Sequence, residues 1–155
     1  EKCITNNYIG YITRTTDQDL SSEDAINHKN EDLKKRAEYI NTLNIDLFVS
    51  IHLNSIGDIP INVHKNKGTS VYYYNENSKE LAKRLQNSIT KELGTRKDGV
   101  KQASFAVIRP TDYIGVLVEV AYMTNPNDSV IYTADDFACK AAKGIAEGIL
   151  EFINK

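Results

Sequence analysis

Apolar side chains recur at helical spacing in three stretches of the chain, separated by polar segments. This spacing places one apolar stripe on each helix and predicts amphipathic helices near residues 31–43, 78–93 and 135–153. The first has Asn30 as its expected N-cap, and Gly94 is expected to close the second. The stripes consist of Leu33, Ala37, Ile40 and Leu43; Leu81, Leu85, Ile89 and Leu93; and Phe137, Ala141, Ile145, Ile149 and Phe152.

Five shorter apolar stretches have the composition of β-strands. They cover residues 8–16, 45–51, 71–74, 105–108 and 116–120, and they are rich in β-branched and aromatic residues. The run IDLFVSI is almost continuously apolar, which is typical of a strand buried on both faces in a parallel sheet. Because strands and helices alternate, we predict a single α/β domain over residues 1–155: a three-layer sandwich whose mainly parallel, twisted sheet has helices on both faces.

Composition narrows the possible classes of protein. The 155 residues are 41% hydrophobic and 26% charged, with a formal net charge of -2 and a pI near 5.9. This balance gives no reason to expect a nucleic acid or an anionic membrane as partner. No apolar segment approaches the ~20 residues needed to span a bilayer. The two cysteines, Cys3 and Cys139, make neither a disulfide framework nor a thiolate zinc pair.

Two polar residues stand out against this background because each belongs to a predicted strand. His52 closes the apolar run LFVSIH, and Glu119 lies inside GVLVEVAY with apolar neighbours on both sides. A buried carboxylate is costly unless it is paired, protonated or bound to a metal. Taken singly, His52 is also explained as a core histidine and Glu119 as a member of an ion pair. Together they indicate a metal or acid–base site at the carboxyl edge of the sheet.

Other candidates carry weaker signals. Asn54 follows His52 closely, and Arg109 could bind a substrate carboxylate through its guanidinium, so both are expected substrate-binding residues. His28 and His64 lie in polar segments, where a histidine needs no function. The tyrosines at 72–74 are explained by packing, with alternate rings facing the core and solvent.

Several stretches resemble the zinc-dependent N-acetylmuramoyl-L-alanine amidases of the amidase-3 type, which include autolysins and spore-cortex enzymes. DLFVSIHLNS is similar to that family's second zinc-histidine motif, and GVLVEVAYMTNPND to the segment with its catalytic glutamate. YITRTTDQDL, KGTSVYYY, SKELAKRLQ and DGVKQASFAVIR follow the family's order. The similarity extends from about Tyr11 to Phe152.

This resemblance implies a hydrolase that cuts the amide between N-acetylmuramic acid and L-alanine in peptidoglycan. It assigns a Zn²⁺ ligand to His52 and the general base beside the metal to Glu119. Zinc held by three protein ligands keeps one position open for an activated water. The expected setting is extracellular, at a bacterial cell wall, with a muropeptide as substrate.

The sequence departs from the family pattern at the first zinc motif. In the family, a histidine in a Gly-His-Gly-Gly-like loop and a following glutamate complete the metal site, and neither has a counterpart here. We therefore expect either a preceding strand that carries these ligands, whose loss would expose apolar edges, or a degenerate relative that binds the cell wall or regulates another enzyme without catalysis.

Overall fold

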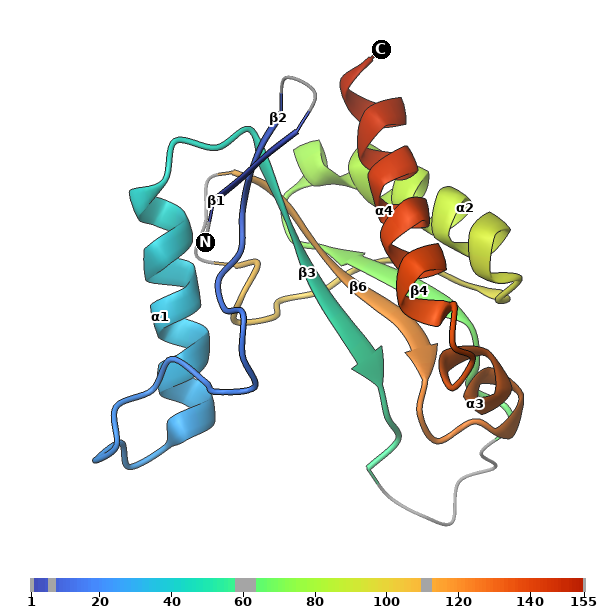
Figure 1. Cartoon of the computed structure of the whole chain (residues 1–155), viewed down its shortest axis with the longest axis horizontal. Coiled ribbons are helices and arrows are strands. Elements are labelled where there is room, and N and C mark those ends of the chain that lie inside the picture. The colour runs from blue at the N-terminus through green and yellow to red at the C-terminus, as the bar shows by residue number, and fades with distance from the viewer. Residues whose placement is uncertain (1, 6–7, 58–63, 110–112, 155) are drawn as a thin grey trace. The chain divides into compact units, whose positions relative to one another are not determined.

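The computed structural model describes residues 2–5, 8–57, 64–109 and 113–154, with side chains from residue 8 onward. The contacts divide the chain into two compact units, residues 1–45 and 46–155, and each is described by itself (Figure 1). Among the described helices, none combines the length and the apolar character needed to cross a membrane.

The first unit consists of a β-hairpin and one helix. Strand β1 (Lys2–Thr5) pairs antiparallel with β2 (Tyr8–Tyr11), and α1 spans His28–Thr42. The N-cap of α1 is Asn27, whose side chain accepts a hydrogen bond from the Asn30 backbone N–H at 3.0 Å, so the expected cap at Asn30 lies three residues too late.

The loop before α1 is fixed to the first turns of that helix. Glu31 accepts hydrogen bonds from the Ser22 hydroxyl at 2.8 Å and pairs with Lys35 at 2.7 Å. These two contacts, with Lys35 the larger cause, lower the pKa of Glu31 to about 2. Asp32 likewise accepts from the Leu20 N–H and from Arg36.

The second unit is built on a four-stranded mixed sheet with strand order β3-β6-β4-β5. Its strands are β3 (Leu47–Asn54), β4 (Thr69–Tyr73), β5 (Lys97–Gln102) and β6 (Ile114–Tyr122). The outer pairs β3–β6 and β4–β5 are parallel, whereas the central pair β4–β6 is antiparallel. The predicted α/β class and a mainly parallel sheet flanked by helices are confirmed.

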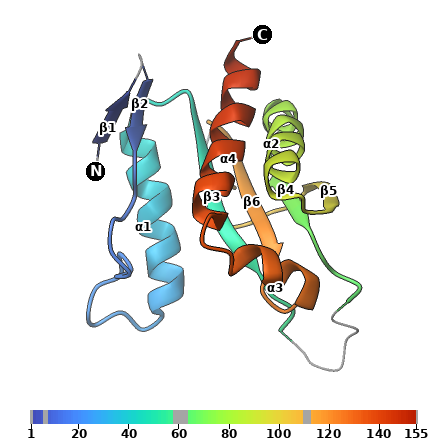
Figure 2. The same cartoon turned by 45° about the vertical axis from the view of Figure 1, so that its right-hand side comes forward.

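Helices pack on this sheet through the predicted stripes. A short 3₁₀ turn, η1 (Glu76–Ser78), leads into α2 (Lys79–Leu93), and α3 (Pro126–Tyr132) precedes α4 (Phe137–Ile153). Helices α2 and α4 lie side by side over the sheet (Figure 2). Their apolar stripes join one buried core with the sheet residues Val71, Val116, Val118 and Val120. The predicted end of α2 is also confirmed, since Gly94 adopts the left-handed conformation with φ 70°.

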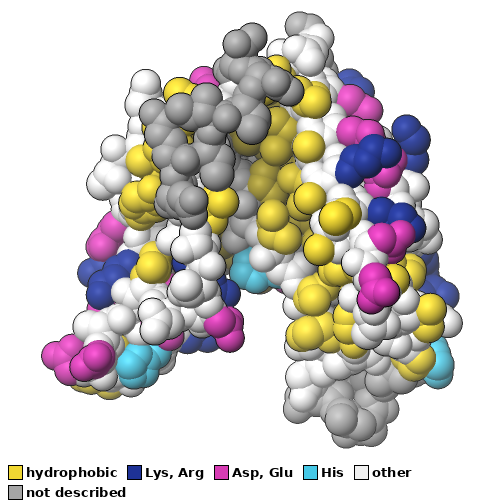
Figure 3. Space-filling view, viewed as in Figure 1, with side chains coloured by type: hydrophobic (Ala, Val, Ile, Leu, Met, Phe, Trp, Pro, Cys, Tyr) yellow, Lys and Arg dark blue, Asp and Glu magenta, His cyan; other side chains and the backbone are white. Residues whose placement is uncertain are grey.

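The outer surface of these two helices is charged, with both signs interspersed (Figure 3). Two ion pairs join α2 to α4: Lys143 with Glu92 at 2.9 Å and Arg84 with Glu151 at 3.9 Å. Exposed pairs of this kind contribute at most about 1 kcal/mol each, so packing in the core holds the helices together.

Two predicted strands are wrong. The expected strand at residues 8–16 stops at Tyr11 and pairs only with β1, outside the four-stranded sheet. The expected strand at 105–108 is a turn, in which Val107 and Ile108 are buried without ladder pairing. The sheet instead takes the polar segment KDGVKQ as its edge strand β5, because an edge strand needs backbone pairing with β4 more than an apolar face.

The closest approach of α2 and α4 depends on two glycines of α4. A Cβ at Gly144 would lie 2.8 Å from the Ile89 Cα, and one at Gly148 would lie 2.9 Å from the Leu85 Cα. These neighbours are backbone atoms, so they can move away only if the helices separate. The two glycines therefore determine how deeply the helices pack.

We expect Gly144→Ala to lower the free energy of unfolding by about 1–3 kcal/mol, as overpacking does in cores. At a solvent-exposed helix position the same change would raise the free energy of unfolding by about 0.5–1 kcal/mol. The sign of the change therefore shows whether the two helices are in close contact at Gly144. Urea denaturation measures the difference, and Ala142→Gly at an exposed position of α4 calibrates the intrinsic helix effect. A stabilised Gly144→Ala protein would contradict the close packing.

Candidate active site

A row of polar positions crosses three neighbouring strands of the sheet. Glu119 on β6 is in register with His52 on β3 and with Ser70 on β4, and Ser70 is in turn paired with Gly99 on β5. Residues in register on adjacent strands have side chains on the same face of the sheet. His52 and Glu119 therefore share one face, as the sequence predicted. The neighbouring Val71 and Val118 belong to the core on the opposite face.

Glu119 is the residue of this row whose pKa is shifted by its surroundings. Its side chain is half-buried, and its Oε2 atom is buried with no hydrogen-bond partner among the described residues. This burial raises the pKa of Glu119 from 4.5 to about 7. A carboxyl group with such a pKa exchanges a proton readily at neutral pH, which is the property that general acid–base catalysis requires.

His52 lies inside β3 rather than at its end, because the strand continues two residues further, to Asn54. The Nε2 atom of its exposed ring lies 2.8 Å from the Ser50 hydroxyl, two positions earlier on the same face. Strand β3 forms one edge of the described sheet, and Ile51 on it is 58% exposed.

A β-bulge changes the face on which β6 presents its last residue. Between the pairs His52–Glu119 and Asn54–Tyr122, β6 contains one residue more than β3. Tyr122 is therefore turned to the Glu119 face, and the charge of Glu119 is among the smaller causes that raise the pKa of Tyr122. Burial is the largest of these causes.

Two charged residues of β5, Asp98 and Lys101, also lie on this face, and no sequence pattern had singled them out. The Tyr122 hydroxyl donates to the Asp98 carboxylate at 3.2 Å, and the Lys101 Nζ donates to the same carboxylate oxygen at 2.7 Å. The Lys101 Nζ also lies 5.6 Å from the centroid of the Tyr72 ring. Simple strand alternation would place Tyr122 opposite Glu119, so only the bulge reveals this cluster.

The segment after β6 is held by a buried polar network. The Asp128 Oδ2 atom accepts hydrogen bonds from the backbone N–H groups of Gly68 at 2.6 Å and Tyr122 at 2.9 Å. The side chain of Asn125 caps α3 by accepting from the N–H groups of Asn127 and Asp128. The motif TNPND thus fixes the end of the strand that carries Glu119.

The remaining predicted residues lie apart from this row or stay untested. Asn54 ends β3, and its carbonyl accepts from the Met123 N–H at 2.7 Å. Arg109 is exposed at the end of the turn after β5, and His64 is exposed in another turn. His28 begins α1 in the first unit, with its Nδ1 2.6 Å from the Ser21 hydroxyl. Substrate binding by Asn54 and Arg109 stays a prediction.

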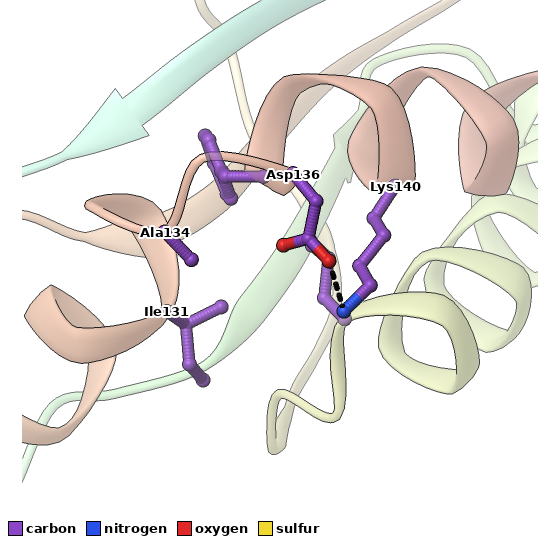
Figure 4. Close-up of a pocket in the computed structure, with 6 residues that line it drawn as sticks. Ile131, Ala134, Asp136 and Lys140 are labelled. Carbon is purple, nitrogen blue, oxygen red and sulfur yellow. Dashed lines mark ion pairs between the residues drawn. The ribbon is translucent and has the colours of Figure 1, made fainter.

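Two cavities lie away from the Glu119 row. One pocket of about 140 Å³ lies between α3 and the start of α4, where Asp136 pairs with Lys140 (Figure 4). A wider one of about 500 Å³ lies in the first unit and is lined by Asp17, Gln18, Asp19, Ser21, Ser22, Glu23 and His28.

The donor atoms of the described residues do not make a complete metal site. Structural and catalytic zinc sites use three or four protein ligands. Among the described residues, no three His, Cys, Asp or Glu side chains come together in a way that could hold a metal ion. His52 with Glu119 beside it offers one imidazole and one carboxyl, so no catalytic step is assigned to a metal here.

The α/β sheet places a half-buried glutamate and a histidine in one row, which is a candidate acid–base pair. The family of N-acetylmuramoyl-L-alanine amidases matches residues 4–151, and the chain belongs to this family.

Named relatives agree with this assignment. The chain is 35% identical over 124 residues to the N-acetylmuramoyl-L-alanine amidase LytC of Bacillus subtilis, covering 77% of this chain and 24% of LytC. It is 27% identical to the germination-specific amidase of the same species, covering 93% and 61%. The solved CwlD amidase from Clostridioides difficile, in complex with the GerS lipoprotein, has a TM-score of 0.80 at 28% identity, covering 91% and 73%. The chain thus spans less than two thirds of the length of either Bacillus subtilis amidase.

Proposed function

We propose that this chain carries the catalytic glutamate of a peptidoglycan hydrolase, an N-acetylmuramoyl-L-alanine amidase that acts at a bacterial cell wall, outside the cell. Family membership supports the reaction and the substrate. The observation that carries the proposal for the site is Glu119, a half-buried carboxyl group with a pKa near 7, placed in register with His52.

In this proposal Glu119 moves one proton during the hydrolysis. Its carboxylate accepts a proton from the water whose oxygen forms a bond to the lactyl carbonyl carbon of N-acetylmuramic acid. The same proton then passes to the alanine nitrogen as the C–N bond breaks, which releases the peptide as an amine. A group with a pKa close to the working pH serves both transfers, because neither protonation state is strongly disfavoured.

His52 is proposed as one ligand of the zinc ion that the family uses, and Asn54 and Arg109 as contacts to the substrate. One imidazole cannot hold zinc tightly, and the described residues supply no third ligand. A metal at this site would therefore require donors beyond those that the described residues bring together. A histidine and a glutamate like those of the family's first zinc motif would meet this requirement.

We expect the chain by itself to retain well below one zinc per molecule after desalting. Elemental analysis by mass spectrometry measures the metal content, and His52→Ala is expected to remove most of what remains. The matched control is His64→Ala, an exposed histidine in a turn. One tightly held zinc per chain that survives His52→Ala would show that His52 is not a ligand, and His64 and His28 would be the next candidates.

The proposed activity is tested with purified muropeptides and zinc, using the chain alone and the chain fused behind the segment of LytC that precedes the part similar to this chain. The fused form is expected to release a free muramic acid carboxyl group together with a peptide that begins with L-alanine. Mass spectrometry identifies both products. Cleavage at another bond would overturn the substrate assignment. A fused form that binds zinc and muropeptide without cleaving it would favour a non-catalytic wall-binding module.

A further inference from the structure

Ser70 occupies the centre of the sheet beside Glu119, and its hydroxyl group has no evident use. Its side chain is fully buried in β4, and its Oγ atom has no hydrogen-bond partner among the described residues. Most buried hydroxyl groups in native proteins are hydrogen-bonded, so an isolated one calls for an explanation. Neither the sheet ladder nor the core supplies one here.

The second buried side-chain oxygen without such a partner belongs to the residue in register with it. Ser70 is the antiparallel partner of Glu119, whose Oε2 atom is the other buried oxygen that the described residues leave unpaired. Directly opposed residues on antiparallel strands have Cβ atoms about 4.5–5.5 Å apart. A serine hydroxyl at this separation can reach the carboxyl group by rotation about χ1 or through one ordered water.

The residues next to Ser70 on β4 and β5 offer no uncommitted side-chain donor to Glu119. The Thr69 hydroxyl is engaged with the Val120 carbonyl at 2.8 Å and with the Thr95 hydroxyl at 2.6 Å. Val71 faces the core, and Gly99, the partner of Ser70 on β5, has no side chain. Of these positions, only Ser70 has a hydroxyl group in register with Glu119 and not engaged elsewhere among the described residues.

We infer that Ser70 is a positioning residue for Glu119: its hydroxyl group donates to Oε2, directly or through one water, and holds the carboxyl group in one orientation. The buried oxygen is then anchored inside the sheet, and the exposed side of the carboxyl group is left for the substrate. The inferred hydrogen bond rests on the register of Ser70 with Glu119 and on the burial of their unpaired oxygens. Its effect on catalysis rests, in addition, on the proposed function.

The hydrogen bond is tested on the chain itself by infrared spectroscopy at about pH 5.5, where ordinary carboxyl groups are ionised. The C=O stretch of protonated Glu119 is then identified as the band that Glu119→Gln removes. Donation from Ser70 lowers this frequency, so Ser70→Ala is expected to shift the band to higher wavenumber and Ser70→Thr to restore it. A wild-type band already at the position of a free carboxyl group, or no shift in Ser70→Ala, would overturn the inference.

In the fused, active form, Ser70→Ala is expected to lower kcat about tenfold with KM unchanged, the scale of one lost hydrogen bond, and Ser70→Thr to recover it. Ser88→Ala is the matched control, because Ser88 is a buried serine whose hydroxyl donates to the Leu85 carbonyl within α2. If Glu119→Gln abolishes activity and Ser70→Ala leaves kcat unchanged, the inference about Ser70 alone fails. If Glu119→Gln leaves full activity, the proposed function fails, and the infrared result still decides the hydrogen bond.

Discussion

Glu119→Gln is expected to lower the turnover of muropeptides by the fused form about 10²–10⁴-fold, the usual contribution of a general acid–base group. Glutamine keeps the shape of the side chain but cannot accept and return the proton. Initial rates of peptide release measure the effect. The matched control is Glu92→Gln, which removes a carboxylate that pairs with Lys143 on the outer surface of α2. Equal rates in the wild type and Glu119→Gln would exclude Glu119 as the proton carrier.

The same variant should also change how the stability of the unfused chain depends on pH. Burial raises the pKa of Glu119 from 4.5 to about 7, so the folded state holds a proton that the unfolded state releases between these two values. The wild type should therefore lose stability as the pH rises through this window, relative to Glu119→Gln, which does not titrate. Thermal melts at both ends of the window test the sign. A gain in wild-type stability with rising pH, relative to Glu119→Gln, would contradict the burial of this carboxyl group.

Asp128→Ala is expected to lower the free energy of unfolding by about 2–4 kcal/mol. The substitution leaves the buried N–H groups of Gly68 and Tyr122 without their shared acceptor, and an unpaired buried donor costs about 1–3 kcal/mol. Urea denaturation gives the difference. Because the Tyr122 N–H lies at the end of the bulge that turns Tyr122, the loss should also weaken the Tyr122–Asp98 contact.

Two variants show whether the acceptor oxygen is responsible. Asp128→Asn keeps one side-chain oxygen and should lose less stability than Asp128→Ala. Asp136→Ala removes an exposed carboxylate that pairs with Lys140 at 2.7 Å, and it should change stability by at most about 1 kcal/mol. An effect of Asp128→Ala no larger than that of Asp136→Ala would refute the proposed role of the buried network.

Helices α2 and α4 and the shared position of His52 and Glu119 were predictable because the signals are local. The apolar residues from Leu81 to Leu93 recur at the helical period, so this segment forms a helix whichever sheet its apolar side packs against. The segments that form β3 and β6 are so apolar that a buried strand is the structure expected for them. A polar residue inside such a strand then predicts a functional site, because burying a polar side chain is energetically costly.

The tertiary structure alone decided which strands pair and which side chains meet on one face. The polar segment of β5 became a strand because β4 offered it backbone partners, while the more apolar residues 105–108 filled a turn. The antiparallel pairing of β4 with β6 brought Ser70 to Glu119, and the bulge in β6 brought Tyr122 there. Register and bulges depend on hydrogen bonds between segments far apart in sequence, and one residue of shift moves a side chain to the other face. The sequence by itself determined helices α1, α2 and α4, strands β3, β4 and β6, and the candidate glutamate, and only the fold determined the neighbours of that glutamate.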